Sequence, residues 1–200
     1  PGVERADIEI TPTIEEPVRV AVKPLQNVTS DAELDWVGDG LANLLRDQLS
    51  SSRYAVVLSP VSWISLADGA SSDAELLEKA KAAGLDYFVS GELLGDAETL
   101  LATVRVTNLR AGIDVMSQTY PDLSQSELVN SSTRIAVNIK QAMKIPRETE
   151  LQSLSADFVT NNLSAYEAYI DGLQHYNRFE YEEAEKDMNT ALALAPEFYI

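Results

Sequence analysis

The feature that constrains this chain most is a pattern of small residues near its C-terminal end. Gly172, Ala184, Ala191 and Pro196 are separated by 12, 7 and 5 positions. Small side chains at such intervals let two antiparallel helices approach closely, and Pro196 stops the second helix because proline cannot donate a helical hydrogen bond. Residues 164–200 are therefore predicted to form a helical hairpin and the start of a next element. A single hairpin cannot bury its own apolar face, so it must pack on the preceding domain, on further repeats or on a partner.

This spacing resembles that of a tetratricopeptide repeat, and Tyr181 supplies the aromatic residue that usually opens its second helix. The resemblance is incomplete, because the first-helix positions that usually hold Trp, Leu and Tyr hold Ala168, Asp171 and His175. An ordinary helical hairpin with small residues at its contact is the alternative. Either structure favours a binding or assembly protein over an enzyme.

One face of the first hairpin helix is a possible partner-binding face. Tyr166, Tyr169, Leu173 and Tyr176 recur at helical spacing, and in tetratricopeptide arrays such positions tend to line the groove that receives a peptide. The favoured alternative is that this stripe packs on the preceding domain or on a next repeat. The expected partners are a protein or peptide, or a second copy of the chain through the hairpin.

The residues before the hairpin predict an α/β fold with a mixed β-sheet and packed helices. β-Strands are expected at Val18–Val22, Tyr54–Leu58, Tyr87–Leu94, Leu100–Val106 and Ile113–Tyr120, and helices at 34–49, Val61–Leu66, 74–80 and Leu128–Met143. The first two strands should be parallel and joined by a right-handed crossover. The last three should form an antiparallel meander with turns at Gly95-Asp96 and Ala111-Gly112.

Capping boxes and prolines set the expected boundaries. The four predicted boxes are Ser30 with Glu33, Ser72 with Glu75, Ser124 with Glu127 and Ser164 with Glu167. The expected organisation is a linker at 1–17 with a short edge strand at Ile8–Ile10, an α/β domain at 18–145, a connection at 146–163 and the hairpin from 164. Pro146 should end the last helix of the α/β domain.

The charge of the chain argues against several classes of partner. It carries 15 basic and 32 acidic residues, a net charge of −17. Such a surface repels phosphate backbones and anionic lipids, so we expect no nucleic-acid partner and no direct membrane contact. The absence of cysteine excludes disulfides, thiolate metal sites and thiol catalysis.

No catalytic, cofactor-binding or metal-binding constellation is recognisable, and no cofactor is expected. Gly38-Asp39-Gly40 lies inside a helical pattern rather than at a helix start, so we interpret it as a close packing point and not as a phosphate loop. The only histidine, His175, is expected on the surface or between the two hairpin helices. Trp36 and Trp63 are expected in the core or at its boundary. A hydrolase or nucleotide-binding domain with an unusual acidic site is the enzymatic alternative.

Several motifs of the first 145 residues resemble the family of α/β domains similar to the amino-terminal domain of TolB. They are Val20-Ala21-Val22-Lys23-Pro24-Leu25 with Asn27 and Asp31, Asp39-Gly40-Leu41, the run Gly84-Leu85-Asp86-Tyr87-Phe88-Val89-Ser90-Gly91, and Val104-Arg105-Val106-Thr107. The family more often has Leu-Pro-Phe where this chain has Lys23-Pro24-Leu25. Residues 163–184 look like the joint and repeat that follow this domain in bacterial serine/threonine kinases of eukaryotic type.

The resemblance implies a non-catalytic sensing or protein-interaction region of a larger bacterial signalling protein, following a serine/threonine kinase domain. The alternatives are a structural oligomerisation domain and the regulatory region of a winged-helix transcription regulator. An extracytoplasmic place in a membrane-anchored protein is expected, with a cytoplasmic place as the alternative. Because the chain begins at Pro1 and not at Met, we expect it to be part of a longer protein.

Overall fold

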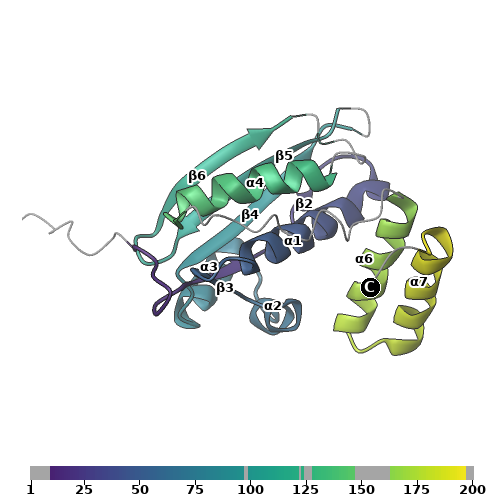
Figure 1. Ribbon diagram of the computed structural model, residues 1–200, viewed down its shortest axis with the longest axis horizontal. Helices are drawn as coiled ribbons and strands as arrows, with labels where there is room; N and C mark the ends of the chain where they lie inside the picture. Colours follow the sequence, from purple (N-terminus) through teal and green to yellow (C-terminus); the bar gives the residue numbers. More distant parts are fainter. Residues whose placement is uncertain (1–9, 97–98, 122, 124–127, 147–162, 197–200) are drawn as a thin grey trace, which may run out of the picture.

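The computed structural model describes residues 10–96, 99–121, 123, 128–146 and 163–196, and it is a mixed β-sheet with helices on both faces and a helical hairpin beside it (Figure 1). The strands are β1 Val18–Val22, β2 Gln26–Asn27, β3 Ala55–Val57, β4 Tyr87–Leu94, β5 Leu101–Asn108 and β6 Ile113–Tyr120. The helices are the 3-10 turn η1 Ala32–Leu34, α1 Asp35–Ser50, α2 Pro60–Ala67, α3 Asp73–Ala82, α4 Leu128–Ala142, α6 Leu163–Asn177 and α7 Tyr181–Leu194. The predicted α/β class with a C-terminal hairpin is confirmed.

The sheet has the order β3-β1-β4-β5-β6, and β2 pairs with the second half of β4. β1 is parallel to β3, and β4, β5 and β6 are antiparallel, as predicted. β1 is also parallel to β4, a pairing that was not predicted. Gly95 and Gly112 have φ of 96° and 66° at the two meander turns, a conformation that costs glycine little. The short strand β2 was not predicted, because a strand of only two residues is too short to show an alternating pattern.

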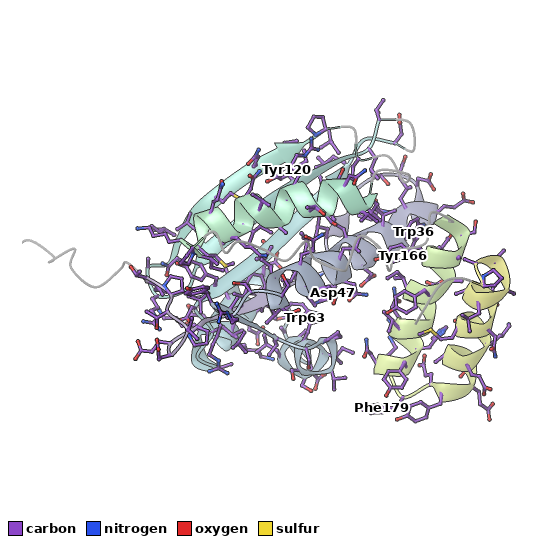
Figure 2. All side chains as sticks on the ribbon, in the orientation of Figure 1. Trp36, Asp47, Trp63, Tyr120, Tyr166 and Phe179 are labelled. Carbon is purple, nitrogen blue, oxygen red and sulfur yellow. The ribbon has the colours of Figure 1, made fainter. Side chains whose placement is uncertain are left out.

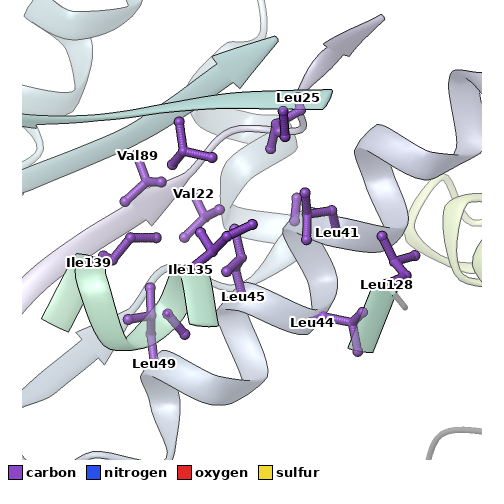
Figure 3. Packing of buried hydrophobic residues seen from close by; sticks show 14 of the residues in the cluster. Val22, Leu25, Leu41, Leu44, Leu45, Leu49, Val89, Leu128, Ile135 and Ile139 are labelled. Carbon is purple, nitrogen blue, oxygen red and sulfur yellow. The ribbon is translucent and has the colours of Figure 1, made fainter. Parts of the chain in front are cut away.

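The larger core lies between the sheet and the helices α1 and α4 (Figure 3). Alternate residues of β1 point to opposite faces of the sheet: Val20 and Val22 enter this core, and Ala21 enters the smaller core beneath α2 and α3. In β5 alternate residues also share one face, since Ala102, Val104 and Val106 are all buried.

A close backbone contact fixes where α1 lies. The chain leaves β1 at Pro24, and the carbonyl oxygen of Leu25 would lie 2.1 Å from a Cβ placed on Gly38. The Leu25 N–H donates to the Gly38 carbonyl at 3.3 Å. The Leu25 side chain packs against Gly91 of β4, where an added Cβ would lie 3.1 Å from the Leu25 Cγ. The interpretation of the α1 glycines as packing residues is confirmed for Gly38.

The structure corrects some of the predicted helix ends. At α3 the Ser72 hydroxyl accepts the Glu75 N–H at 3.2 Å, as predicted, but the Glu75 carboxylate accepts the Ser71 N–H instead of that of Ser72. The box at Ser30 is wrong, because Asp31 is the N-cap and its carboxylate accepts the Glu33 N–H at 3.0 Å. A carboxylate adjacent to the first turn reaches an amide that the Ser30 hydroxyl, one residue further back, does not reach.

The end of α4 and the start of α6 lie close to the predicted positions. α6 begins at Leu163, one residue before the cap predicted at Ser164. α4 ends at Ala142, and Lys144 has a φ of 57°, which places a left-handed cap before Pro146. Ser124 and Glu127 lie outside the described residues, as do Ile8 and most of the predicted connection at 146–163. The division into domains stays a prediction.

Gly38→Ala should lower the free energy of unfolding by about 2–4 kcal/mol, because the new Cβ meets backbone atoms that cannot move aside. The higher helix propensity of alanine, about 1 kcal/mol, offsets only part of this cost. Gly172→Ala is the matched control: its Cβ would meet the flexible Met188 side chain at 3.1 Å and the Ala184 carbonyl oxygen only at 3.3 Å, against 2.1 Å for the Leu25 oxygen at Gly38. Its stability should change by less than about 1 kcal/mol. Urea denaturation of the three proteins measures both effects, and equal stability of all three would contradict the Leu25–Gly38 contact.

Candidate functional site

The hairpin helices α6 and α7 meet at small residues. A Cβ on Gly172 would lie 3.2 Å from Cγ of Met188 and 3.3 Å from the carbonyl oxygen of Ala184, and Ala184 and Ala191 are buried. His175 lies between the helices, with Nδ1 2.8 Å from a carboxylate oxygen of Asp187. The predicted close approach and the inter-helix place of the histidine are confirmed, while membership of the tetratricopeptide family stays a prediction.

The hairpin docks on α1 through Tyr166. This side chain is only 5% exposed, and its hydroxyl donates to the Gly40 carbonyl at 3.0 Å. Its ring packs edge-on against Trp36, with centroids 6.3 Å apart (Figure 2). Burial raises the pKa of Tyr166, which keeps the hydroxyl a neutral donor. A Cβ on Gly40 would lie 3.2 Å from Cε1 of Tyr166, so the second glycine of α1 is also a packing residue.

The docking divides the predicted partner-binding face into three side chains that pack on the protein and one, Tyr176, that stays exposed. Tyr169 packs on Tyr166 at 6.2 Å between ring centroids, and Leu173 is partly buried against the larger core. These three side chains lie toward the α/β domain, as the alternative interpretation expected. Tyr176 is exposed at the far end of α6. Partner binding by the stripe stays a prediction, and Tyr176 is the member that the structure leaves accessible.

An aromatic tip, which we define as Tyr176, Phe179 and Tyr181, occupies the turn between α6 and α7 (Figure 2 labels Phe179). The three side chains are 56%, 67% and 58% exposed. Tyr181 contacts both others edge-on, at 5.8 Å from Tyr176 and 6.3 Å from Phe179. Phe179 has a φ of 65°, a strained conformation for a bulky residue. Sequence reasoning missed Phe179, because a turn residue belongs to no periodic pattern.

A cleft of about 230 Å³ lies between α1, α2 and the hairpin. Its polar lining comes from α1 on one side and from the end of α6 and its turn on the other: Asp39, Asn43 and Arg46 face Gln174, Asn177 and Arg178. Its apolar lining is Pro24, Pro60, Trp63, Ile64 and Leu173. The Trp63 ring also packs on Phe88 of the smaller core, with 6.0 Å between ring centroids. Trp63 therefore lies at the core boundary, as predicted.

Arg46 is the buried charge of this cleft. Its side chain donates from Nη1 to the Asn43 amide oxygen at 2.8 Å and from Nη2 to the Val22 carbonyl at 2.7 Å. Its Nε–H is buried and has no hydrogen-bond partner among the described residues. A buried donor without a partner costs free energy that a ligand acceptor would recover.

Asp39 lies at the seam between α1 and the hairpin. Burial raises the pKa of its carboxyl group, and the positive charges of Arg46 and Arg178 oppose that rise. Gln174 of the hairpin donates to Asp39 at 3.1 Å, so this carboxyl group also helps to hold α6 in place.

Among residues 10–96, 99–121, 123, 128–146 and 163–196, no group of three or more His, Asp or Glu side chains is placed to hold a metal ion. No helix in that part of the chain is both long and apolar enough to cross a bilayer.

Comparison with known proteins finds similarity among solved structures alone, since no family model and no curated protein matches the chain. The chain is similar to TolB from Acinetobacter baumannii, at 15% identity over 66% of this chain and 29% of that one, with a TM-score of 0.47. It is also similar to the C-terminal domain of LpoB from Salmonella enterica (13% identity, 56% of this chain and 84% of that one, TM-score 0.44) and to lipoprotein GNA1162 from Neisseria meningitidis (19%, 62% and 97%, TM-score 0.45). The chain thus spans less than a third of the TolB structure. Each of these TM-scores is below 0.5.

Tyr166→Ala should destabilise the protein by about 3–5 kcal/mol, since it removes a buried aromatic side chain from the contact between α6 and α1. Tyr166→Phe should cost about 1 kcal/mol through loss of the bond to Gly40. Tyr176→Ala, at an exposed position of the same helix, is the control and should cost less than about 1 kcal/mol. Urea denaturation followed by circular dichroism gives the three values, and equal values for the two alanine variants would contradict the docking.

The unfolding free energy of Asp39→Asn should increase relative to that of the natural protein as the pH rises. A raised pKa in the folded state means that the folded protein binds more protons than the unfolded one, so ionisation of Asp39 lowers stability as pH rises through and above the ordinary range of aspartate, about 4. The amide lacks this cost and still accepts from Gln174. Unfolding free energies of both proteins between about pH 3 and pH 7 measure the difference, and a difference that stays constant or shrinks with rising pH would contradict the effect of burial.

Proposed function

We propose that this chain is a non-catalytic protein-interaction region of a larger bacterial signalling protein, and that the aromatic tip of its hairpin receives the partner. The observation that carries the proposal is the exposure of Tyr176, Phe179 and Tyr181 as one contiguous cluster. Tyrosine and other aromatic residues are enriched in interfaces because each buries a large area while ordering few torsions.

Contacts within the tip hold its side chains in place. Tyr181 holds the rings on either side edge-on, and the Phe179 N–H donates to the Tyr176 carbonyl at 3.0 Å. Side chains held in place before binding lose less conformational entropy when the complex forms. The backbone strain at Phe179 is a cost that a role in binding would explain.

The surroundings of the tip indicate the chemistry of the partner. The exposed carboxylates next to it are Glu180, Glu182 and Glu183, with Glu185 one turn further along α7. An apolar centre with an acidic rim fits a partner that offers an apolar pocket surrounded by lysine or arginine, because rim charges steer association and select the partner. A second copy of this chain, at a net charge of −17, fits less well.

The wider setting of this proposal comes from the sequence motifs. The TolB-like motifs followed by a tetratricopeptide-like hairpin support a sensing or interaction region that follows a serine/threonine kinase domain, in an extracytoplasmic place. The regulatory region of a winged-helix regulator and a structural oligomerisation domain are the alternatives that the same architecture allows.

A photo-crosslinking phenylalanine analogue at position 179 of the complete natural protein should give one discrete crosslinked species with a different protein. The same analogue at Ile113, an exposed apolar position on β6 away from the hairpin, is the control and should not give that species. With the partner isolated, Phe179→Ala should weaken binding by about tenfold or more without a change in melting temperature. Added salt should weaken this complex, because it screens the attraction between the acidic rim and a basic partner.

Two outcomes would contradict the proposal. Equal crosslinking from positions 179 and 113 would show that the tip is not the interface. A crosslink between two copies of this chain, strengthened by salt because screening relieves the repulsion of its negative charges, would show an oligomerisation domain instead.

A further inference from the structure

We propose that the cleft between α1, α2 and the hairpin binds a small monocarboxylate with an apolar body. The site is distinct from the aromatic tip, so the inference does not depend on the proposed protein partner. It rests on three properties of the cleft: a buried guanidinium with an unused donor, a local excess of positive charge, and an apolar wall that includes Trp63.

The polar half of the cleft is built to receive an anion. Arg46 is 8% exposed and is held rigidly by Asn43 and Val22, and its Nε–H has no partner in the described part of the chain. Arg178 of the hairpin lines the opposite wall. Guanidinium groups bind carboxylates through charge-assisted hydrogen bonds that are about twice as strong as neutral ones.

The charge of the cleft contrasts with that of the whole chain. Two guanidinium groups, Arg46 and Arg178, face one carboxyl group, Asp39, across the cleft. Burial raises the pKa of Asp39, and the positive charges of the two arginines oppose that rise. The residues that line the cleft thus carry one net positive charge, whereas the whole chain carries a net charge of −17. The acidic surface repels large polyanions, whereas a ligand with a single charge meets the pocket with little opposition.

The size and the apolar wall define the remainder of the ligand. An engineered protein cavity of about 150 Å³ holds benzene, so a cleft of about 230 Å³ has room for a ring or branched chain together with a carboxylate. Trp63, Ile64 and Leu173 are part of the apolar lining. Inorganic phosphate would leave this wall uncovered, and a nucleotide would exceed the space.

A ligand in this cleft would contact both parts of the protein. Asn43 and Arg46 belong to α1, whereas Asn177 and Arg178 belong to the hairpin, and the Gln174–Asp39 hydrogen bond spans the same seam. A molecule that contacts both walls stabilises the docked hairpin over the undocked one, because it binds the docked form better.

Two-dimensional ¹H–¹⁵N NMR tests the inference directly, because Arg46 and Trp63 both line the cleft and each has a side-chain N–H that gives its own signal. Sodium phenylacetate should shift both signals saturably at millimolar concentration or below. The indole signal of Trp36, which packs on Tyr166 and is not among the residues that line the cleft, should move less. Phenylacetamide, which lacks the charge, and inorganic phosphate, which lacks the apolar body, should bind at least about tenfold more weakly.

Two matched arginine variants test whether the guanidinium group of Arg178 binds the carboxylate. Arg178→Gln should weaken phenylacetate binding by about tenfold, and Arg105→Gln, on the exposed face of β5, should leave it unchanged. Phe179→Ala should also leave it unchanged, which separates this site from the aromatic tip. The inference is overturned if no signal saturates, if phenylacetamide binds as well as phenylacetate, or if Arg105→Gln weakens binding as much as Arg178→Gln.

Discussion

The structure depends on the burial of α1 on nearly every side. Eleven of its 16 residues are buried, by the sheet and α4 along its length and by the hairpin near its start. Gly38 and Gly40 lie about 200° apart around the helix axis, so one admits the backbone of Leu25 and the other admits the ring of Tyr166. A side chain at either position would separate α1 from one of the two parts that it joins.

The motifs that resemble TolB-like domains mostly act as structural devices. Asp86 is a clear case: its carboxylate accepts the Arg19 N–H at 2.8 Å and pairs with Arg110 at 2.6 Å, which ties β1, β4 and the turn after β5 together. Asn27 has a similar role, since its amide donates to the Asp31 carbonyl at 2.8 Å and to the Asp35 carboxylate at 2.6 Å at the start of α1. Motifs of this kind specify an architecture and leave the ligand and the partner open.

The docking of the hairpin creates both candidate sites. Tyr166 uses the first turns of α6 for contact with α1, so the opposite end of the hairpin projects with its aromatic tip exposed. The same docking brings Gln174 and Arg178 to face Asp39 and Arg46 across the cleft. Partner binding at the tip and ligand binding in the cleft would therefore act on one rigid element.

The sequence by itself determined what depends on local pattern. The alternation in β5, the turn glycines, the small residues at the α6–α7 contact and the packing role of Gly38 all follow from the spacing of side chains within one element. Tertiary structure decided what depends on residues far apart in the chain. The Tyr166 stripe turned inward because the hairpin returns to α1 after more than 100 residues. Arg46 became a buried donor to the Val22 carbonyl because α1 packs on β1, where Val22 lies 24 residues earlier in the chain. The strained Phe179 and the cap at Asp31 escaped prediction because a single turn residue leaves no period to read.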